Sequence, residues 1–150
     1  MTLRRPCWLF LTGLLFLASS LISWDAVGQQ VFTLTRVELV FQNGWGDIVV
    51  PRRYPHLRVY ATLNFSGTGI LRATWKVDGR PIGLIAEPVV FGERLVFASG
   101  PTVILPTTDP GQHRLMLEIE HPKPAFRVPT ITYFVTAEEY EDFQKRMGIK

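Results

Sequence analysis

The side chains best able to do chemistry in this sequence are two histidines with carboxylates close by. His113 and His121 lie in one segment of alternating polar and apolar residues, which also contains Glu118 and Glu120. A metal site needs three or four converging ligands, whereas an extended strand only aligns residues two apart. Leucine and isoleucine occupy the intervening positions. We therefore expect a structural or surface role for both histidines and no metal site.

Other catalytic arrangements are equally hard to assemble. No serine has the Gly-x-Ser-x-Gly context of a nucleophile elbow, and the single cysteine is Cys7, close to the N-terminus. Carboxylates that could cleave a glycosidic bond, such as Glu87 and Asp109, are scattered through predicted loops. The glycines match no phosphate-binding pattern. The sequence therefore predicts a protein that is not an enzyme and carries no cofactor.

Aromatic and arginine side chains near turns are the stronger functional lead. The candidates share a large planar group in or beside a predicted loop, or on a polar strand face: Trp45, Arg52, Arg53, Tyr54 and Tyr60. These residue types dominate the energetics of protein interfaces. An aromatic ring with polar neighbours also stacks on sugar rings. We expect a surface that binds another protein or a glycan. The alternatives are that Trp45 covers one end of the core and that the two arginines are only solvated.

The first 28 residues predict the compartment. Arg4 and Arg5 precede an apolar run over residues 8–22, and Ala26-Val27-Gly28 places small residues at alternate positions. This order is typical of a secretory signal peptide, residues 1–28, and the run is shorter than the roughly 20 residues of a membrane span. We expect a periplasmic or extracellular protein with no membrane insertion after cleavage. The alternative is an uncleaved anchor.

Charge and cysteine content narrow the class of partner. The formal net charge is +3, and leaving out Arg4, Arg5 and Asp25 lowers it to +2. That is too near balance to favour nucleic acid or an anionic membrane. Because Cys7 lies in the predicted leader, the exported domain is free of disulfides, which favours a bacterial cell envelope. We expect another envelope protein as the partner, with a glycan as the alternative.

Period-two alternation dominates the rest of the chain. Val37, Leu39 and Phe41 alternate with polar residues, as in a strand with one solvated face. The same reasoning predicts strands at 57–65, 71–77, 82–90, 95–97, 113–119 and 131–135, a short extended piece at 48–50, and 103–105 as a candidate eighth strand. Seven or eight short strands at this spacing predict an all-β fold, an antiparallel sandwich over residues 29–136.

Turn chemistry adds detail between residues 78 and 105. Asp78-Gly79 predicts a two-residue hairpin of type I′, which needs positive φ at both positions. Pro81, Gly83 and Pro88 mark strand 82–90 as an edge or bulged strand. The pairing of the strands between 82 and 105 stays open, because prolines and glycines leave the register ambiguous.

The last segment has a different period. Thr136 can cap a short amphipathic helix over residues 137–150, with acidic residues first and basic residues last. Tyr140, Phe143 and Met147 then form one narrow apolar stripe. So short a helix is marginal in water unless the stripe packs on something. We expect it to pack on its own sandwich, and the alternative is the groove of a partner protein.

Several local patterns resemble the immunoglobulin-like sandwich. Trp75 lies in mid-strand, where such domains place the tryptophan that fills the space between the sheets. The stretch Asp109-Pro110-Gly111-Gln112-His113-Arg114-Leu115 is similar to the family's D-x-G-x-Y-x-C signature. His113 then takes the place of the corner tyrosine and Leu115 that of the cysteine. Ala61 or Leu63 takes the place of the other cysteine.

The glycine-containing turn Phe65-Ser66-Gly67-Thr68-Gly69 and the hairpin Trp75-Lys76-Val77-Asp78-Gly79 are also similar to bacterial CARDB-type adhesion modules. The resemblance covers most of residues 31–136. It implies a sandwich held together without an inter-sheet disulfide, so Trp75 and its apolar neighbours must supply the cohesion. It also implies an interaction role, although a fold does not carry a function with it.

Overall fold

Two β-sheets face each other across an apolar core. The computed structural model describes residues 31–90, 94–99 and 103–148, and the predicted leader lies outside them. The elements follow in chain order: β1 (Thr33–Phe41), β2 (Asp47–Arg52), β3 (Val59–Ser66), β4 (Gly69–Val77), β5 (Arg80–Val89), β6 (Arg94–Ala98), β7 (Gly111–His121), β8 (Thr130–Glu139) and α1 (Tyr140–Met147).

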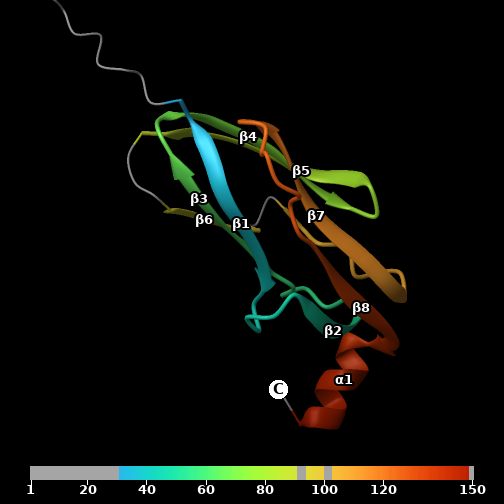
Figure 1. Ribbon diagram of the computed structural model, residues 1–150. Helices are drawn as coiled ribbons and strands as arrows, with labels where there is room; N and C mark the ends of the chain where they lie inside the picture. Colours follow the sequence, from blue (N-terminus) through green and yellow to red (C-terminus); the bar gives the residue numbers. More distant parts are fainter. Residues whose placement is uncertain (1–30, 91–93, 100–102, 149–150) are drawn as a thin grey trace, which may run out of the picture.

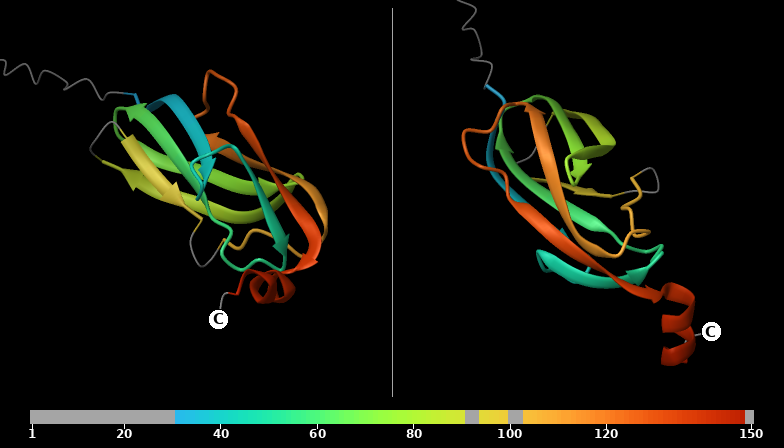
Figure 2. Two further views of the ribbon diagram at one scale, coloured as in Figure 1. Left: turned by 90° about the horizontal axis from the view of Figure 1, so that it is seen from below. Right: turned by 90° about the vertical axis from the view of Figure 1, so that its right-hand side faces the viewer.

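One sheet has three strands in the order β1-β3-β6, and the other has five in the order β2-β8-β7-β4-β5. Figures 1 and 2 show the two layers, with α1 beyond the end of β8. The strand pairs are antiparallel except β2 and β8, which run parallel. The predicted all-β sandwich is confirmed. The parallel pair was not expected from local sequence, because it joins segments more than eighty residues apart.

Alternation along the strands explains how the core forms. In β3 every second residue from Val59 to Phe65 is buried, and β4 contributes Leu71, Ala73, Trp75 and Val77 from the facing sheet. The Trp75 side chain is only 1% exposed. Leu115, at one family cysteine position, and Ala61 and Leu63, the alternatives for the other, are all fully buried. Apolar packing thus occupies the place of the inter-sheet disulfide.

The β4–β5 hairpin has the predicted turn, because Asp78 and Gly79 both have positive φ, at 50° and 80°. β5 lies at the sheet edge, and its pairing with β4 shifts register between Trp75 and Lys76. The structure thus places β5 both at an edge and beside a bulge. Residues 103–105, the candidate eighth strand, form none. Val103 instead packs over Gly83, which leaves room for it by lacking a side chain.

The end of the chain differs from the prediction in where the helix starts. Thr136 lies within β8, and the N-cap is Glu139, which makes no side-chain cap hydrogen bond. The strand continues because Arg52 of β2 pairs with Glu139 in the parallel ladder. At the other helix end, Gly148 adopts φ 68° and its N–H bonds the main-chain oxygens of Gln144 and Lys145. No described helix is long and apolar enough to cross a membrane.

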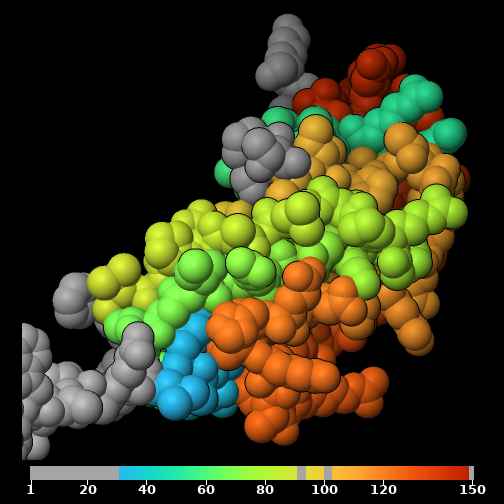
Figure 3. All heavy atoms as spheres, turned by 90° about the horizontal axis from the view of Figure 1, so that it is seen from above, coloured from blue at the N-terminus to red at the C-terminus, as the bar shows by residue number. Residues whose placement is uncertain are grey.

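The connection between β7 and β8 lies beside the start of β1. The rings of Phe32 and His121 are 6.5 Å apart between centroids. Figure 3 shows this orange connection next to the light-blue start of β1. The β7–β8 connection therefore covers part of this end of the sandwich.

Candidate interaction surfaces

The turn between β1 and β2 presents the indole of Trp45 to solvent, with 70% of the residue exposed. The main-chain N–H of Trp45 donates to Oδ1 of Asn43, and Nδ2 of Asn43 donates to the main-chain oxygen of Asp47, both at 3.0 Å. The N–H of Phe41 donates to the main-chain oxygen of Trp45 at 2.8 Å. The indole therefore projects from a hydrogen-bonded turn and does not cover the core.

Arg52 and Arg53 are both held by one carboxylate near the end of the chain. Nη1 of Arg52 lies 3.2 Å from Oε1 of Glu139, and Nη1 of Arg53 lies 3.7 Å from Oε2 of the same residue. Nε of Arg52 also donates to the main-chain oxygen of Thr108 at 2.7 Å. These two arginines join the end of β2 to the end of β8, so their side chains are already engaged within the domain.

Tyr54 packs against the start of the helix. Its ring makes edge-to-face contacts with Tyr140 at 5.3 Å and with His56 at 5.8 Å between centroids. Tyr140 thus packs on its own sandwich, as expected. The rest of the stripe is less buried. Met147 is 58% exposed. Phe143 is half-buried, and the guanidinium carbon of Arg146 lies 5.6 Å from the centroid of its ring.

The predicted aromatic candidates do not form one surface. Trp45 and Tyr54 lie beyond opposite ends of β2, a strand of six residues, which spans roughly 20 Å at about 3.3 Å per residue. Tyr60 lies on β3 in the other sheet, between Val40 and Ala98. The structure therefore leaves Trp45 as the exposed aromatic candidate and separates it from Tyr54.

A polar hollow on the outer face of the three-stranded sheet was missed by the sequence analysis. It measures about 180 Å³ and is lined by Arg36, Glu38, Thr62, Asn64 and Arg94. We call these five residues the arginine hollow. Alternation already placed four of them on polar strand faces. The missing information was the register of β6, which brings Arg94 beside Asn64.

A second polar cluster surrounds His113. Its Nδ1 lies 2.8 Å from Oδ2 of Asp78, its Nε2 lies 2.8 Å from the main-chain oxygen of Asp109, and its ring stacks on Tyr133. The bond to Asp109 is the one that a corner tyrosine makes to backbone a few residues upstream. His113 therefore takes over the corner role that the resemblance implied. The Tyr133 hydroxyl donates to the main-chain oxygen of Pro106 at 2.7 Å.

The groups of this cluster shift one another's pKa values, and His113 and Asp78 each stabilise the charged form of the other. Burial alone would lower the pKa of His113, but its hydrogen bonds to Asp78 and Asp109 and the nearby negative charges outweigh burial and raise the pKa. Burial alone would likewise raise the pKa of Asp78, but bonds from the Arg114 N–H and from His113 outweigh it and lower the pKa. Burial, helped by the charge of Asp78, raises the pKa of Tyr133.

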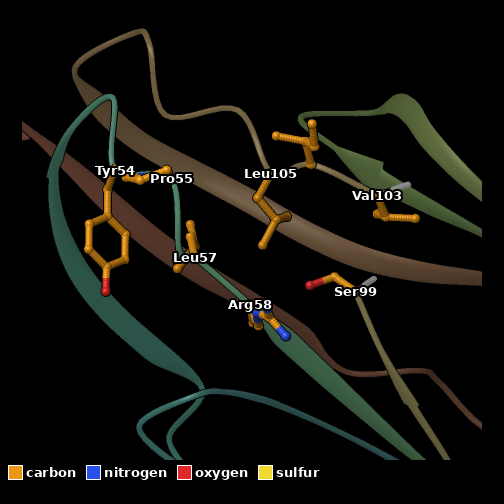
Figure 4. A pocket seen from close by; sticks show the side chains of 8 residues that line it. Tyr54, Pro55, Leu57, Arg58, Ser99, Val103 and Leu105 are labelled. Carbon is orange, nitrogen blue, oxygen red and sulfur yellow. The ribbon is translucent and has the colours of Figure 1, made fainter. Parts of the chain in front are cut away.

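The hollow drawn in Figure 4 lies at the end of the sandwich near the β2–β3 connection. It measures about 90 Å³ and is lined by Tyr54, Pro55, Leu57, Arg58, Ser99, Val103, Ile104 and Leu105. Ser99 is engaged within it, because its Oγ accepts the main-chain N–H of Val59 at 3.0 Å. No group of three or more His, Cys, Asp or Glu side chains within the described ranges could hold a metal ion.

Two solved structures have a similar fold. Both are of the CARDB domain of the PF1109 protein from Pyrococcus furiosus, a solution NMR structure and a crystal structure in complex with di-metal ions. Their TM-scores are 0.53 and 0.52, at 14% identity and 73% coverage of this chain, with 97% and 96% of the solved chains covered. This chain folds as a CARDB-like, immunoglobulin-type β-sandwich.

At 14% identity the likeness to the CARDB domain concerns the fold alone. No family model matches the sequence. No curated protein matches it either. The CARDB-like architecture was thus visible in a few short motifs and in the tertiary structure, but not in overall sequence similarity.

Proposed function

We propose that this chain is a non-catalytic, exported interaction module that binds another protein of the cell envelope through the turn carrying Trp45. The observation that carries the proposal is the exposure of the indole, 70%, on a turn closed by hydrogen bonds. A pre-organised tryptophan loses little conformational entropy on binding, and tryptophan is among the commonest interface hot spots. The CARDB-like fold is in keeping with a non-catalytic domain.

A glycan is the alternative ligand of this turn, and the local geometry supports it less well. Sugar recognition needs free polar side chains beside the aromatic ring, but the Asn43 amide is used within the turn through both of its polar atoms. Tyr54 lies beyond the other end of β2, too far away to extend the stacking surface. A protein anchored on the indole needs no such neighbours.

Crosslinking tests the proposal in the native cell. A photo-crosslinking amino acid replaces Trp45 in the full chain, and a second version carries it at Leu84, which is 80% exposed on edge strand β5. We expect a discrete protein crosslink from position 45 and none from position 84. The purified partner should then bind the Trp45→Ala variant about thirtyfold more weakly, the effect of losing an interface hot spot.

Three results would contradict the proposal. The first is that crosslinks form at position 84 alone, which would indicate recognition through the β5 edge. The second is that Trp45→Ala binds the partner normally. The third is that the protein binds neutral glycans on an array and loses that binding in Trp45→Ala, which would favour the glycan.

A further inference from the structure

The arginine hollow contains two guanidinium groups on either side of one amide. Arg36 of β1 pairs in register with Asn64 of β3, and Asn64 pairs in register with Arg94 of β6. Neighbouring strands are about 4.8 Å apart, so the Cα atoms of the two arginines lie roughly 10 Å apart. Both side chains are long enough to meet above Asn64. One anionic group can therefore contact both guanidiniums at once.

Among the residues that the structure describes, the carboxylate of Glu38 contacts one of the two arginines, Arg36, and holds it loosely. Oε2 of Glu38 lies 3.7 Å from Nη2 of Arg36, with the two side chains 52% and 69% exposed. Ion pairs this exposed contribute little, because water and salt screen them. An incoming anion can replace this contact at small cost. The arginine hollow as a whole keeps an excess of positive charge, two guanidiniums against one carboxylate.

The outer face of the five-stranded sheet lacks this excess, because three cations, Arg72, Lys76 and Arg114, share it with three carboxylates, Asp47, Glu118 and Glu120. There Lys76 forms an ion pair with Glu118, and Glu120 accepts a hydrogen bond from Thr74. Arg72, on the same strand β4, has His121 as its register partner on β7. The two faces therefore differ in charge, and a negative ligand has a reason to choose the three-stranded sheet.

The position of β3 decides which kind of anionic ligand fits. β3 is the central strand, so its main chain is already paired on both sides, with β1 and β6. A peptide that binds a sheet by strand addition needs a free edge, which this strand does not have. A ligand here must use side chains, and β3 offers Tyr60, Thr62 and Asn64 in sequence along the same side. Ring stacking and hydroxyl and amide hydrogen bonds are the contacts that sugars accept.

We propose that the outer face of the three-stranded sheet binds a carboxylate-bearing polysaccharide. Arg36 and Arg94 contact a uronic-acid carboxylate, Asn64 and Thr62 bond the sugar hydroxyls, and Tyr60 contacts a neighbouring ring. This site goes beyond the protein-binding turn proposed above and lies on different residues. A repeating ligand can engage many copies of the domain, so weak single contacts add up to useful avidity.

The test uses polygalacturonate and the protein expressed from its full-length sequence, with binding measured by calorimetry. We expect Arg94→Gln and Arg36→Gln each to weaken binding about threefold to tenfold, as for one exposed charge-assisted contact. Glu38→Gln should strengthen binding, because it removes the competing carboxylate. Arg72→Gln, which makes the same charge change on the opposite outer face, should leave binding unchanged. Trp45→Ala should also leave it unchanged.

Thermal unfolding confirms that each variant is folded, and Arg94→Lys serves as a second variant that keeps the charge but loses the bidentate geometry. Four results would overturn the proposal. The first is that polygalacturonate does not bind. The second is that Arg72→Gln weakens binding as much as Arg94→Gln does, which would indicate that net charge alone drives binding. The third is that a neutral galactan binds equally well, and the fourth is that polyglutamate binds as tightly, which would indicate a peptide ligand.

Discussion

Nδ1 of His113, on β7, lies 2.8 Å from the carboxylate oxygen Oδ2 of Asp78, in the turn between β4 and β5. The other ring nitrogen, Nε2, is 2.8 Å from the main-chain oxygen of Asp109. Both partners can only accept hydrogen bonds. A neutral imidazole has one N–H donor, so the two bonds are satisfied together only when His113 is protonated. The geometry thus explains the raised pKa of this histidine.

Stability should therefore decrease as pH rises through neutrality. A pKa that is raised in the folded state means that the stabilisation from His113 is fully present below its unfolded value, about 6.5. It is lost as pH increases through the raised folded value. We expect urea unfolding to show a higher midpoint at pH 5.5 than at pH 8.5.

Two variants check that His113 is the cause. Asp78→Asn keeps an acceptor for the Arg114 N–H and tolerates the positive φ of 50°, but it removes the negative charge that favours the imidazolium. His113→Tyr replaces the titrating ring by the family's corner residue. The pH dependence should decrease in the first variant and largely disappear in the second. An unchanged dependence in His113→Tyr would assign the effect to another group.

Trp75 should be the largest single contributor to core packing. It is 1% exposed and lies between Gly83 of β5 and Leu117 of β7 in register. We expect Trp75→Ala to lower the free energy of unfolding by about 3–5 kcal/mol, as for other buried large aromatic residues. Trp45→Ala is the matched control, because an exposed side chain usually changes stability by no more than about 0.5 kcal/mol. Similar losses in both variants would contradict the assignment.

Gly83 should be needed for its lack of a side chain. A Cβ at this position would lie 2.5 Å from Cγ2 of Val103. We expect Gly83→Ala to destabilise the protein by about 1–3 kcal/mol through overpacking. The double variant with Val103→Ala should recover part of that loss, a positive coupling that denaturation of the four proteins measures. Strictly additive effects would show that the two residues are not in contact.

Tyr140 should hold the helix against the sandwich. The helix has eight residues, too few to be stable alone in water, and the Tyr140 ring contacts both Tyr54 and His56. We expect Tyr140→Ala to increase hydrogen exchange throughout α1, with little effect on β3 or β7. Met147→Ala, at an exposed position of the same stripe, should not. Faster exchange in Met147→Ala alone would place the helix contact elsewhere.

Much of the fold could be predicted because its determinants are local. Alternation along β3 and β4 indicates which face is buried, and Asp-Gly at 78–79 selects the hairpin turn by its φ preferences alone. The corner role of His113 follows from a motif of seven consecutive residues. Short-range signals of this kind need no knowledge of what lies opposite in space.

The helix start shows where local reasoning fails. Thr136 has good capping chemistry, but the chain stays extended to Glu139. β2 pairs with β8 there, and Glu139 forms ion pairs with Arg52 and Arg53. These partners are far away in sequence, so no local pattern could reveal them. Tertiary pairing outweighed a weak capping preference.

The amino-acid sequence by itself determined a two-layer β-sandwich with Trp75 in its core, because period-two burial and turn preferences act between near neighbours. Only the tertiary structure decided which surfaces exist. It separated Trp45 from Tyr54 by the length of β2, and it placed Arg94 beside Asn64 through the pairing of β6 with β3. Strand register depends on contacts between distant segments, and a shift of one residue would turn Arg94 to the opposite face.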